Sequence, residues 1–394
     1  MDLDLSDKQW PKHISENPQI ADNISNVGSF ICESVHDQYV REGTMVAMPM
    51  SMAGVSEPIA RGESAITAMA LDSNYAVYGG TTGSRSHLFC AMLHGATGFV
   101  HDLGIAEGAK SCTAINVHND IVYACVNDEH TGWIVSVETL QLPFDCLQEW
   151  GVGRKKIEKL TEPAPGRKIV HAISSSESAS FFALLDDGML VKVSLPDGKT
   201  KKLVNIDPTG RFSRRIAMDT NGIIYGTGLN GQIWQYDSGN DNYEKWDAFI
   251  PCGGGRRNYN KAANWAYDEA NNILYGSSEA DGTLFAINIA EKKVRSLGLI
   301  ESFCPAYAMS VTCDGRVFGV AGREKDAGRF FVYDPHEAEL KDLGVCISCL
   351  GERTYGFRFQ TALKWRDGAI LLGEADQSSH LWIYFPSVQA LPKV

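Results

Sequence analysis

The chain has 394 residues, of which 44% are hydrophobic and 21% are charged, and its formal net charge is −12. The hydrophobic share is large enough for an extensive core. The acidic balance argues against a general nucleic-acid or anionic-membrane binder, because both need a basic face, but it leaves room for a local basic pocket that binds an acidic sugar. No run of about eighteen apolar residues occurs, so no membrane-spanning helix is expected.

The N-terminal residues are acidic and polar. The stretch MDLDLSDKQWPKHISENPQ has neither the basic start nor the apolar segment of a signal peptide, so we expect a cytoplasmic protein, or a secreted one if the chain is a mature form. Residues 1–62 fit no repeat and are predicted to form an N-terminal arm. Within it, GTMVAMPMS (43–51) is a candidate outer strand that would close a ring of sheets; the alternative is an arm lying on the side of that ring.

From residue 63 onward, one unit recurs along the chain. A turn leads into an apolar run, a polar gap follows, and a second apolar run ends in another polar stretch. Such copies repeat at intervals of roughly 40–50 residues, a period typical of propeller blades. In chain order, they are residues 74–104, 119–138, 178–203, 221–237, 271–298, 314–344 and 367–386.

Each copy contains four short runs rich in β-branched and aromatic residues, separated by Gly, Asp, Asn and Pro turns, as is typical of strands. No long apolar period of about 3.6 residues occurs, so helix is expected to be scarce. The repeats therefore predict an all-β, seven-bladed β-propeller with four antiparallel strands per blade, because packed blades bury faces that one repeat cannot bury alone. The predicted blades are approximately 63–108, 109–150, 167–208, 212–251, 260–302, 304–349 and 355–394.

The loops at one face of such a propeller contain many cations for an acidic chain. Loops that join the second and third strands share this face with loops that link the blades, and loops on a rigid scaffold often carry function. Because Arg pairs bidentately with carboxylate, we expect a carboxylated ligand here. The candidate residues are His87, Glu107, Arg167, Arg211, Arg214, Arg215, Arg256, Arg257, Tyr259, Tyr355 and Arg358.

The histidines also have a purely structural interpretation. His87 and His380 both begin a third strand in the repeated words SHLF and SHLW, which is equally expected of residues that pack a blade. His171, in KIVHAIS, either points into the channel or packs between blades.

Four cysteines in the segments that enter the last three blades are candidate zinc ligands: Cys252, Cys304, Cys346 and Cys349. The last two form a C-x-x-C, and thiolates in adjacent loops can hold a structural zinc ion. The alternative is that reduced thiols fill the packing of these loops. No cofactor is expected for the chemistry itself. CGGGRR (252–257) is Gly-rich but lacks the strand–loop–helix context of a phosphate loop.

The wording of the repeats resembles a known family. The segments YGGTTGSRSHLF, LYGSSEADGTLF, DGRVFGVAGREKDAGRFFVYDP and YGFRFQTALKWRDGAILLGEADQSSHLWIYFP are similar to those of the seven-bladed polysaccharide lyases, which include ulvan lyases and rhamnose–glucuronate lyases. The resemblance lies in the repeats rather than in the catalytic residues. It implies β-elimination at a uronic acid: a base removes the C5 proton, the C4–O bond breaks, and an unsaturated sugar remains.

The resemblance also implies roles for particular residues. His87 matches a histidine that acts in the family as base or acid, whereas Glu107 stands where the family has a second histidine. This departure implies either a changed mechanism or no activity. Arg167 or Lys168, and Arg214 or Arg215, match arginines that neutralise the carboxylate, and Arg167 and Arg215 are expected to hold it. Either Tyr123 or Tyr259 would act as a phenolic acid. Some members carry a structural zinc, and residues expected to contact the substrate here are Glu107, His171, Arg214, Arg257, Tyr355 and Arg358.

The leading hypothesis is therefore a lyase that cleaves a uronic-acid-containing glycan, at a rhamnose–glucuronate linkage, with an acidic poly- or oligosaccharide as its partner and neither nucleic acid nor membrane. One alternative is a non-catalytic propeller that binds a glycan or a protein. Another is a hydrolase on the same scaffold, since one fold hosts many chemistries.

Overall fold

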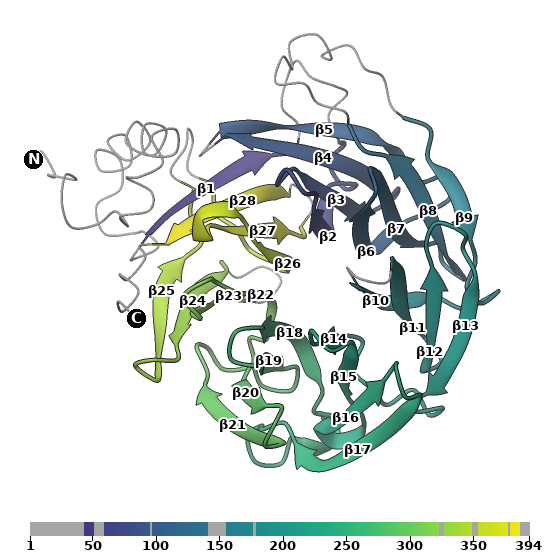
Figure 1. Ribbon diagram of the computed structural model, residues 1–394. Coiled ribbons are helices and arrows are strands. Elements are labelled where there is room, and N and C mark those ends of the chain that lie inside the picture. The colour runs from purple at the N-terminus through teal and green to yellow at the C-terminus, as the bar shows by residue number, and fades with distance from the viewer. Residues whose placement is uncertain are drawn as a thin grey trace, which may run out of the picture.

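The computed structural model describes residues 43–50, 59–94, 97–140, 155–175, 179–322, 327–348, 354–376 and 379–386. Seven four-stranded sheets, all with antiparallel pairing, are arranged in a ring around a central axis (Figure 1). The predicted all-β, seven-bladed β-propeller is thereby confirmed. Helical elements within these ranges are short 3-10 turns, namely η2 (Leu229–Gly231), η3 (Arg257–Tyr259) and η4 (Arg366–Gly368).

The first four blades follow one another in chain order, and each runs from an inner strand at the axis to an outer strand at the rim. Blade one contains β2 (Ala65–Leu71), β3 (Val77–Thr82), β4 (His87–His94) and β5 (Thr97–Ile105). Blade two contains β6 (Ser111–His118), β7 (Ile121–Asn127), β8 (Gly132–Glu138) and β9 (Glu158–Thr161). Blade three contains β10 (Ile169–Ser175), β11 (Ser180–Leu185), β12 (Met189–Ser194) and β13 (Thr200–Asn205). Blade four contains β14 (Ala217–Met218), β15 (Ile223–Thr227), β16 (Gln232–Asp237) and β17 (Asn242–Phe249).

The last three blades complete the ring. Blade five contains β18 (Ala262–Asp268), β19 (Ile273–Ser278), β20 (Leu284–Asn288) and β21 (Lys293–Gly298). Blade six contains β22 (Ala306–Val311), β23 (Val317–Ala321), β24 (Arg329–Asp334) and β25 (Glu339–Val345). Blade seven contains β26 (Phe359–Lys364), β27 (Ile370–Glu374), β28 (His380–Pro386) and, as its outer strand, β1 (Gly43–Pro49).

The seventh blade joins the two ends of the described chain. β1 pairs antiparallel with β28 along its whole length, from Gly43 opposite Pro386 to Pro49 opposite His380. Pairing an N-terminal strand with the last blade fastens the ring by backbone hydrogen bonds and leaves only short sheet edges.

The core lies between the blades. Seven clusters of buried apolar side chains each fill the space between two neighbouring sheets. The repeated glycine after an aromatic residue in the second strand makes room for this packing. A Cβ on Gly79, Gly226 or Gly276 would collide with the ring of the residue opposite it in the third strand. The rings concerned are those of Phe89, Trp234 and Phe285.

Hydrogen bonds between blades position the inner strands. The N–H of Ala262 donates to Thr227 Oγ1 at 2.9 Å, and the N–H of Ala306 donates to Ser277 Oγ at 3.0 Å. Each acceptor lies in the last two residues of the second strand of one blade, and each donor begins the inner strand of the next. The starts of the inner strands are therefore fixed relative to one another around the axis.

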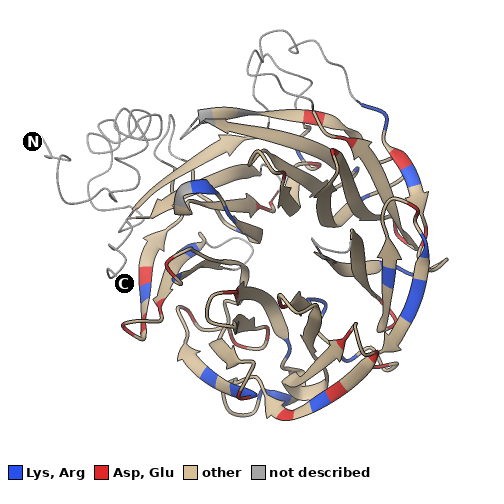
Figure 2. Ribbon diagram, viewed as in Figure 1, with Lys and Arg blue, Asp and Glu red and all other residues tan. Residues whose placement is uncertain are grey.

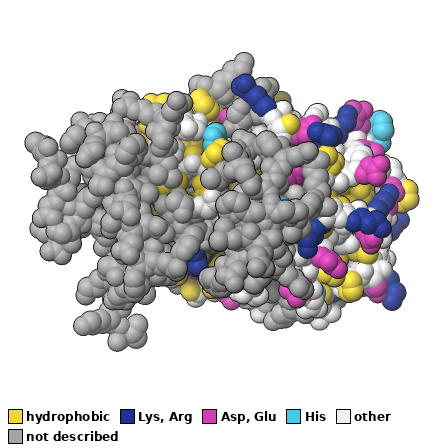
Figure 3. Space-filling model, turned by 90° about the horizontal axis from the view of Figure 1, so that it is seen from above, with side chains coloured by type: hydrophobic (Ala, Val, Ile, Leu, Met, Phe, Trp, Pro, Cys, Tyr) yellow, Lys and Arg dark blue, Asp and Glu magenta, His cyan; other side chains and the backbone are white. Residues whose placement is uncertain are grey.

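Charged residues lie mainly at the rim. Figure 2 shows Lys, Arg, Asp and Glu along the outer strands β9, β13, β17 and β21, while the inner strands are nearly devoid of them. In the edge-on view, positively and negatively charged side chains are intermixed on the described part of the rim (Figure 3). A cation cluster near the axis is therefore an exception to the general charge distribution. Within the described ranges, no helix is long and apolar enough to cross a membrane.

Candidate functional site

A pocket of about 410 Å³ lies at the axis, where the inner strands begin. In every blade except the fourth, the pairing of the inner strand with the second strand shifts by one residue near this point, which is the sign of a β-bulge. A bulge bends the strand and redirects one side chain, and such bulges often occur beside functional sites. All of the bulged residues line the pocket: Thr67, Thr113, Val170, Ala263, Tyr307 and Gln360.

The axial pocket is strongly cationic. Arg214, Arg215, Lys261 and Arg358 line it, and Glu279 is the carboxylate in its wall. These positive charges would attract a ligand that carries one or more carboxylates, although the chain as a whole has a net charge of −12. The pocket falls within the size range of small-ligand sites, about 300–1,000 Å³.

Arg215 is held in place by its neighbours. Ser213 Oγ accepts from the Arg215 N–H at 3.0 Å, and Trp265 Nε1 donates to the Arg215 carbonyl at 3.1 Å. Its guanidinium Nη2 donates to the Gln360 carbonyl at 3.4 Å, so an arginine from the loop before blade four reaches the inner strand of blade seven. Burial lowers the pKa of Arg215, but a guanidinium remains charged at neutral pH.

Tyr307 is the phenol of this pocket. Desolvation and the charge of Glu279 raise its pKa, although Arg358 and Arg215 act in the opposite direction. The hydroxyl is therefore protonated at neutral pH, and it can donate a hydrogen bond or a proton. The axial pocket thus contains a proton donor, Tyr307, and the carboxylate of Glu279 together with two guanidinium groups.

His171 lies beside this loop rather than in the pocket wall. Its Nδ1 accepts from the Ile216 N–H at 3.3 Å. Desolvation of the ring, followed by the charge of Arg215, holds the pKa of His171 well below its usual value. The ring is thus neutral with its proton on Nε2, and it supports the loop that carries Arg215.

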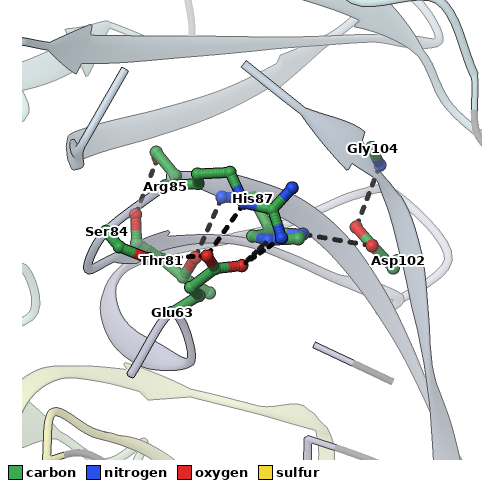
Figure 4. Close-up of polar contacts among 8 residues, drawn as sticks. Glu63, Thr81, Ser84, Arg85, His87, Asp102 and Gly104 are labelled. Carbon is green, nitrogen blue, oxygen red and sulfur yellow. Dashed lines mark hydrogen bonds and ion pairs between the residues drawn. The ribbon is translucent and has the colours of Figure 1, made fainter. Parts of the chain in front are cut away.

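His87 lies inside blade one, with 1% of its surface exposed. Figure 4 shows it between two carboxylates: Nε2 is 2.9 Å from Glu63 Oε2, and Nδ1 is 3.1 Å from Asp102 Oδ2. Glu63 also accepts from Arg85, with 2.8 Å between Nε and Oε1, and from Ser84. This buried network, which we call the His87 cluster, comprises Glu63, Arg85, His87 and Asp102.

The His87 cluster requires a protonated imidazole. Both ring nitrogens face carboxylates, and only the imidazolium can donate to two acceptors at once. Burial opposes the charge on His87, but its bonds to Asp102 and Glu63 outweigh this and raise its pKa. Hydrogen bonds from Arg85, Ser84 and His87 lower the pKa of Glu63 to about 2, against the effect of burial. An imidazolium with both N–H groups occupied has no lone pair with which to remove a proton from a substrate.

The cluster predicts a pH-dependent stability. Because the pKa of His87 is higher in the folded chain, its contribution is complete below the ordinary histidine pKa of about 6.5 and is lost as the pH rises through the raised value. The lowered pKa of Glu63 has the opposite sign: its contribution is present above the ordinary Glu pKa and is lost as the pH falls toward about 2.

The measurement is the melting temperature of the unsubstituted protein and of His87→Gln at several pH values. Their difference is expected to shrink as the pH rises from about 6 to about 9. A difference that stays constant over this interval would show that folding does not raise the pKa of His87.

The other predicted site residues do not line the axial pocket. Arg167 is exposed and pairs with Asp187, at 3.3 Å between Nε and Oδ2. Tyr259 is 80% exposed on η3, and the Arg257 guanidinium lies 5.2 Å from the centre of the Phe249 ring. Glu107 lines a separate pocket together with Arg85. Tyr355 forms an isolated β-bridge with Ile347. Of the predicted cations, the structure brings Arg214, Arg215 and Arg358 together.

Sequence reasoning missed Lys261 and Tyr307, and it did not single out Glu279 from other acidic residues. Lys261 directly precedes β18, and Tyr307 is the second residue of β22. A comparison of the starts of all inner strands would have found both, because residues at or beside these starts line the axial pocket in six of the seven blades.

The predicted zinc ligands lie in different surroundings. Cys304 is buried in the apolar cluster between blades five and six, and Cys346 in the one between blades six and seven, where burial raises its thiol pKa well above the usual value. Cys252 is half-buried, and Cys349 lies outside the described residues. In the part of the chain that is described, no group of three or more His, Cys, Asp or Glu could hold a metal ion. The zinc site stays a prediction, because one of its four ligands is not described.

No family model matches this chain, and no curated protein matches its sequence. Solved structures share its fold. A streptogramin B lyase has a TM-score of 0.64 at 8% identity, covering 88% of this chain and 98% of that one. A catalytically inactive virginiamycin B lyase from Staphylococcus aureus with quinupristin has a TM-score of 0.61 at 9% identity, with 87% and 100% covered. YCF48 from Cyanidioschyzon merolae has a TM-score of 0.58 at 10% identity, with 87% and 99% covered.

Such low identities show the fold alone. None of these structures is a polysaccharide lyase, so the resemblance to that family stays a hypothesis.

Proposed function

We propose that the axial pocket binds a carboxylated sugar and that the protein is a lyase acting on a uronic-acid-containing glycan by β-elimination. The observation that carries this proposal is the set of four cations around one carboxylate and one protonated phenol in the axial pocket. That two proteins with the same fold are lyases by name is compatible with an elimination reaction on such a scaffold.

The pocket contains the groups that elimination needs. Arg215 and Arg358 pair with the uronate carboxylate, and this lowers the cost of the negative charge that develops when the C5 proton leaves. Glu279 is the base that takes this proton. The electron pair forms the C4=C5 double bond, the C4–O bond breaks, and Tyr307 gives its proton to the leaving oxygen. The tyrosinate formed, held beside two guanidinium groups, regains a proton from solvent or from Glu279.

In this proposal, His87 has a structural role and Glu279 takes the role of base that the family resemblance assigned to His87. The reason is geometric. Both nitrogens of His87 are bonded to carboxylates within blade one, and His87 is not among the residues that line the axial pocket.

The direct test is incubation with ulvan, gum arabic and pectic fragments, followed by ultraviolet absorbance of the unsaturated product. An increase in absorbance with one of these glycans is the expected result. Sugar binding without any product would instead indicate a glycan-binding propeller, and new reducing ends without an absorbing product would indicate a hydrolase. Either outcome would contradict the lyase proposal.

Glu279→Gln tests the assignment of the base. We expect kcat to fall by about 10²–10⁴-fold, because the amide cannot accept the C5 proton, while substrate binding is retained. The matched control is Glu269→Gln, which changes an exposed carboxylate at the end of blade five's inner hairpin and should leave kcat unchanged. A Glu279→Gln protein with normal kcat would remove Glu279 from the reaction.

A further inference from the structure

A second cavity, of about 490 Å³, opens between the third and fourth blades. The segment that links β13 to β14 contributes to both cavities: Arg211 lines the second one, and Arg214 and Arg215 line the axial pocket. Three residues lie between Arg211 and Arg215, so their Cα atoms are at most about 14 Å apart. The two cavities are therefore neighbours on the same face of the propeller.

The second cavity has an unsatisfied donor in its wall. Trp234 lines it and is 1% exposed, yet its Nε1–H has no hydrogen-bond partner among the described residues. A buried N–H without an acceptor is unfavourable, and native structures rarely leave one unexplained. A Cβ built on Gly228, which also lines the cavity, would lie 3.9 Å from Trp234 Cδ1, the carbon bonded to Nε1. Gly228 therefore places no side chain over this edge of the indole, while Nε1 itself has no exposed surface and lies just beneath the cavity wall.

Two exposed cations also line this cavity. Arg211 and Lys245 line the cavity, and neither forms an ion pair with another residue in the described ranges. Asp207, the carboxylate of the same wall, instead accepts from the Thr209 N–H at 2.8 Å and from the Thr209 hydroxyl at 2.7 Å. Against the effect of desolvation, these bonds and the charges of Lys245 and Arg211 lower the pKa of Asp207.

The cavity also offers apolar surface. Leu229, on η2, is 43% exposed, and Tyr243 is half-buried with its ring 6.0 Å from that of Trp234. A sugar unit presents this combination: apolar C–H faces, hydroxyl and ring oxygens that accept hydrogen bonds, and, in an acidic glycan, a carboxylate or sulfate. Aromatic and aliphatic walls with a few polar groups are typical of ligand sites.

We propose that the second cavity is a subsite that binds another anionic sugar unit of the same oligosaccharide chain whose uronate occupies the axial pocket. Arg211 and Lys245 bind its anionic group, Leu229 and Tyr243 contact its apolar face, and Trp234 lies in the wall of the site. This inference rests on the proposed function of the axial pocket. It adds that the protein prefers chains over single sugars, and that the preference comes from blades three and four.

The test measures affinity by calorimetry for glucuronate and for size-fractionated oligosaccharides from ulvan, both native and desulfated. Glu279→Gln protein is used so that the chains are not cut. We expect oligosaccharides to bind more tightly than glucuronate. The double variant Arg211→Gln/Lys245→Gln should lose about tenfold or more of the oligosaccharide affinity and keep the glucuronate affinity, since both changes are at exposed side chains outside the axial pocket.

A matched control and a second readout accompany this measurement. Lys201→Gln/Lys202→Gln removes two exposed cations from β13 and should leave both affinities unchanged. The indole N–H resonance of Trp234 should shift when the oligosaccharide binds. If the double variant loses affinity for native but not for desulfated oligosaccharides, the anion bound by Arg211 and Lys245 is sulfate. An equal loss of affinity for both kinds of chain identifies carboxylate.

The possible failures are distinguishable. If glucuronate binds but the double variant keeps the full oligosaccharide affinity, the subsite is overturned and the axial proposal stands. If the protein binds neither glucuronate nor oligosaccharide, the axial proposal is overturned and the subsite with it.

Discussion

Replacing His87 by alanine is expected to lower the stability of the protein by about 3–5 kcal/mol, because removing one partner of a buried ionic network leaves the others uncompensated. Glu63 is 6% exposed and Asp102 is 2% exposed, so water cannot replace the lost imidazolium. Arg85 would still pair with Glu63, and Asp102 would keep the bond from the Gly104 N–H at 3.0 Å but lose its bond to the imidazolium. The measurement is thermal or denaturant unfolding.

His130→Ala is the matched control for this prediction. His130 is an exposed histidine of blade two, and its removal should change the stability by no more than about 0.5 kcal/mol. If His87→Ala melts like the unsubstituted protein but has lost elimination activity, the family-based assignment of His87 as a catalytic residue is correct and the structural role proposed here is wrong.

Replacing Arg215 by methionine is expected to lower kcat/KM for an acidic glycan by about 10²–10³-fold. Arg215 carries positive charge into the axial pocket, spans from blade four to blade seven, and has a carbonyl and an N–H that are fixed by Trp265 and Ser213. Methionine fills similar space without charge, so the loss reports the electrostatic contribution. Arg215→Lys should recover only part of the activity, because an ammonium cannot pair bidentately with a carboxylate.

Arg167→Met provides the control for Arg215. The family resemblance assigns both arginines to carboxylate neutralisation, but the Arg167 side chain is 51% exposed and faces Asp186 and Asp187. We expect kcat/KM to be nearly unchanged in this variant. A loss as large as that of Arg215→Met would mean that the substrate reaches the loop before blade three, and it would require a different position for the carboxylate.

The candidate site could be predicted only in part. The sequence indicated that cations from several inter-blade loops meet at one face, and Arg214, Arg215 and Arg358 do line the axial pocket. It could not exclude Arg167 or Tyr259, because the direction in which a loop side chain points depends on partners from other blades. It also favoured His87 through a motif, although SHLF and SHLW repeat in two blades, as residues that pack a blade would.

The amino-acid sequence by itself determined the architecture. Its period, the alternation of short apolar runs with turn residues, and the glycine that follows an aromatic residue are all local features. They specify four strands and a close contact within each blade, and blades of this kind bury their faces only by packing against one another. The ring of seven sheets follows from these local features.

Only the tertiary structure decided which side chains meet at the axis and which ones neutralise each other inside a blade. The residues of the axial pocket come from all seven blades, and their approach depends on bulges and on hydrogen bonds between neighbouring sheets. Likewise, Glu63 and Asp102 lie 24 and 15 residues from His87 in the chain, and their contact with it arises when β2, β3, β4 and β5 pair. Long-range contacts of this kind leave no period in a sequence, because each is made once and between unlike residues.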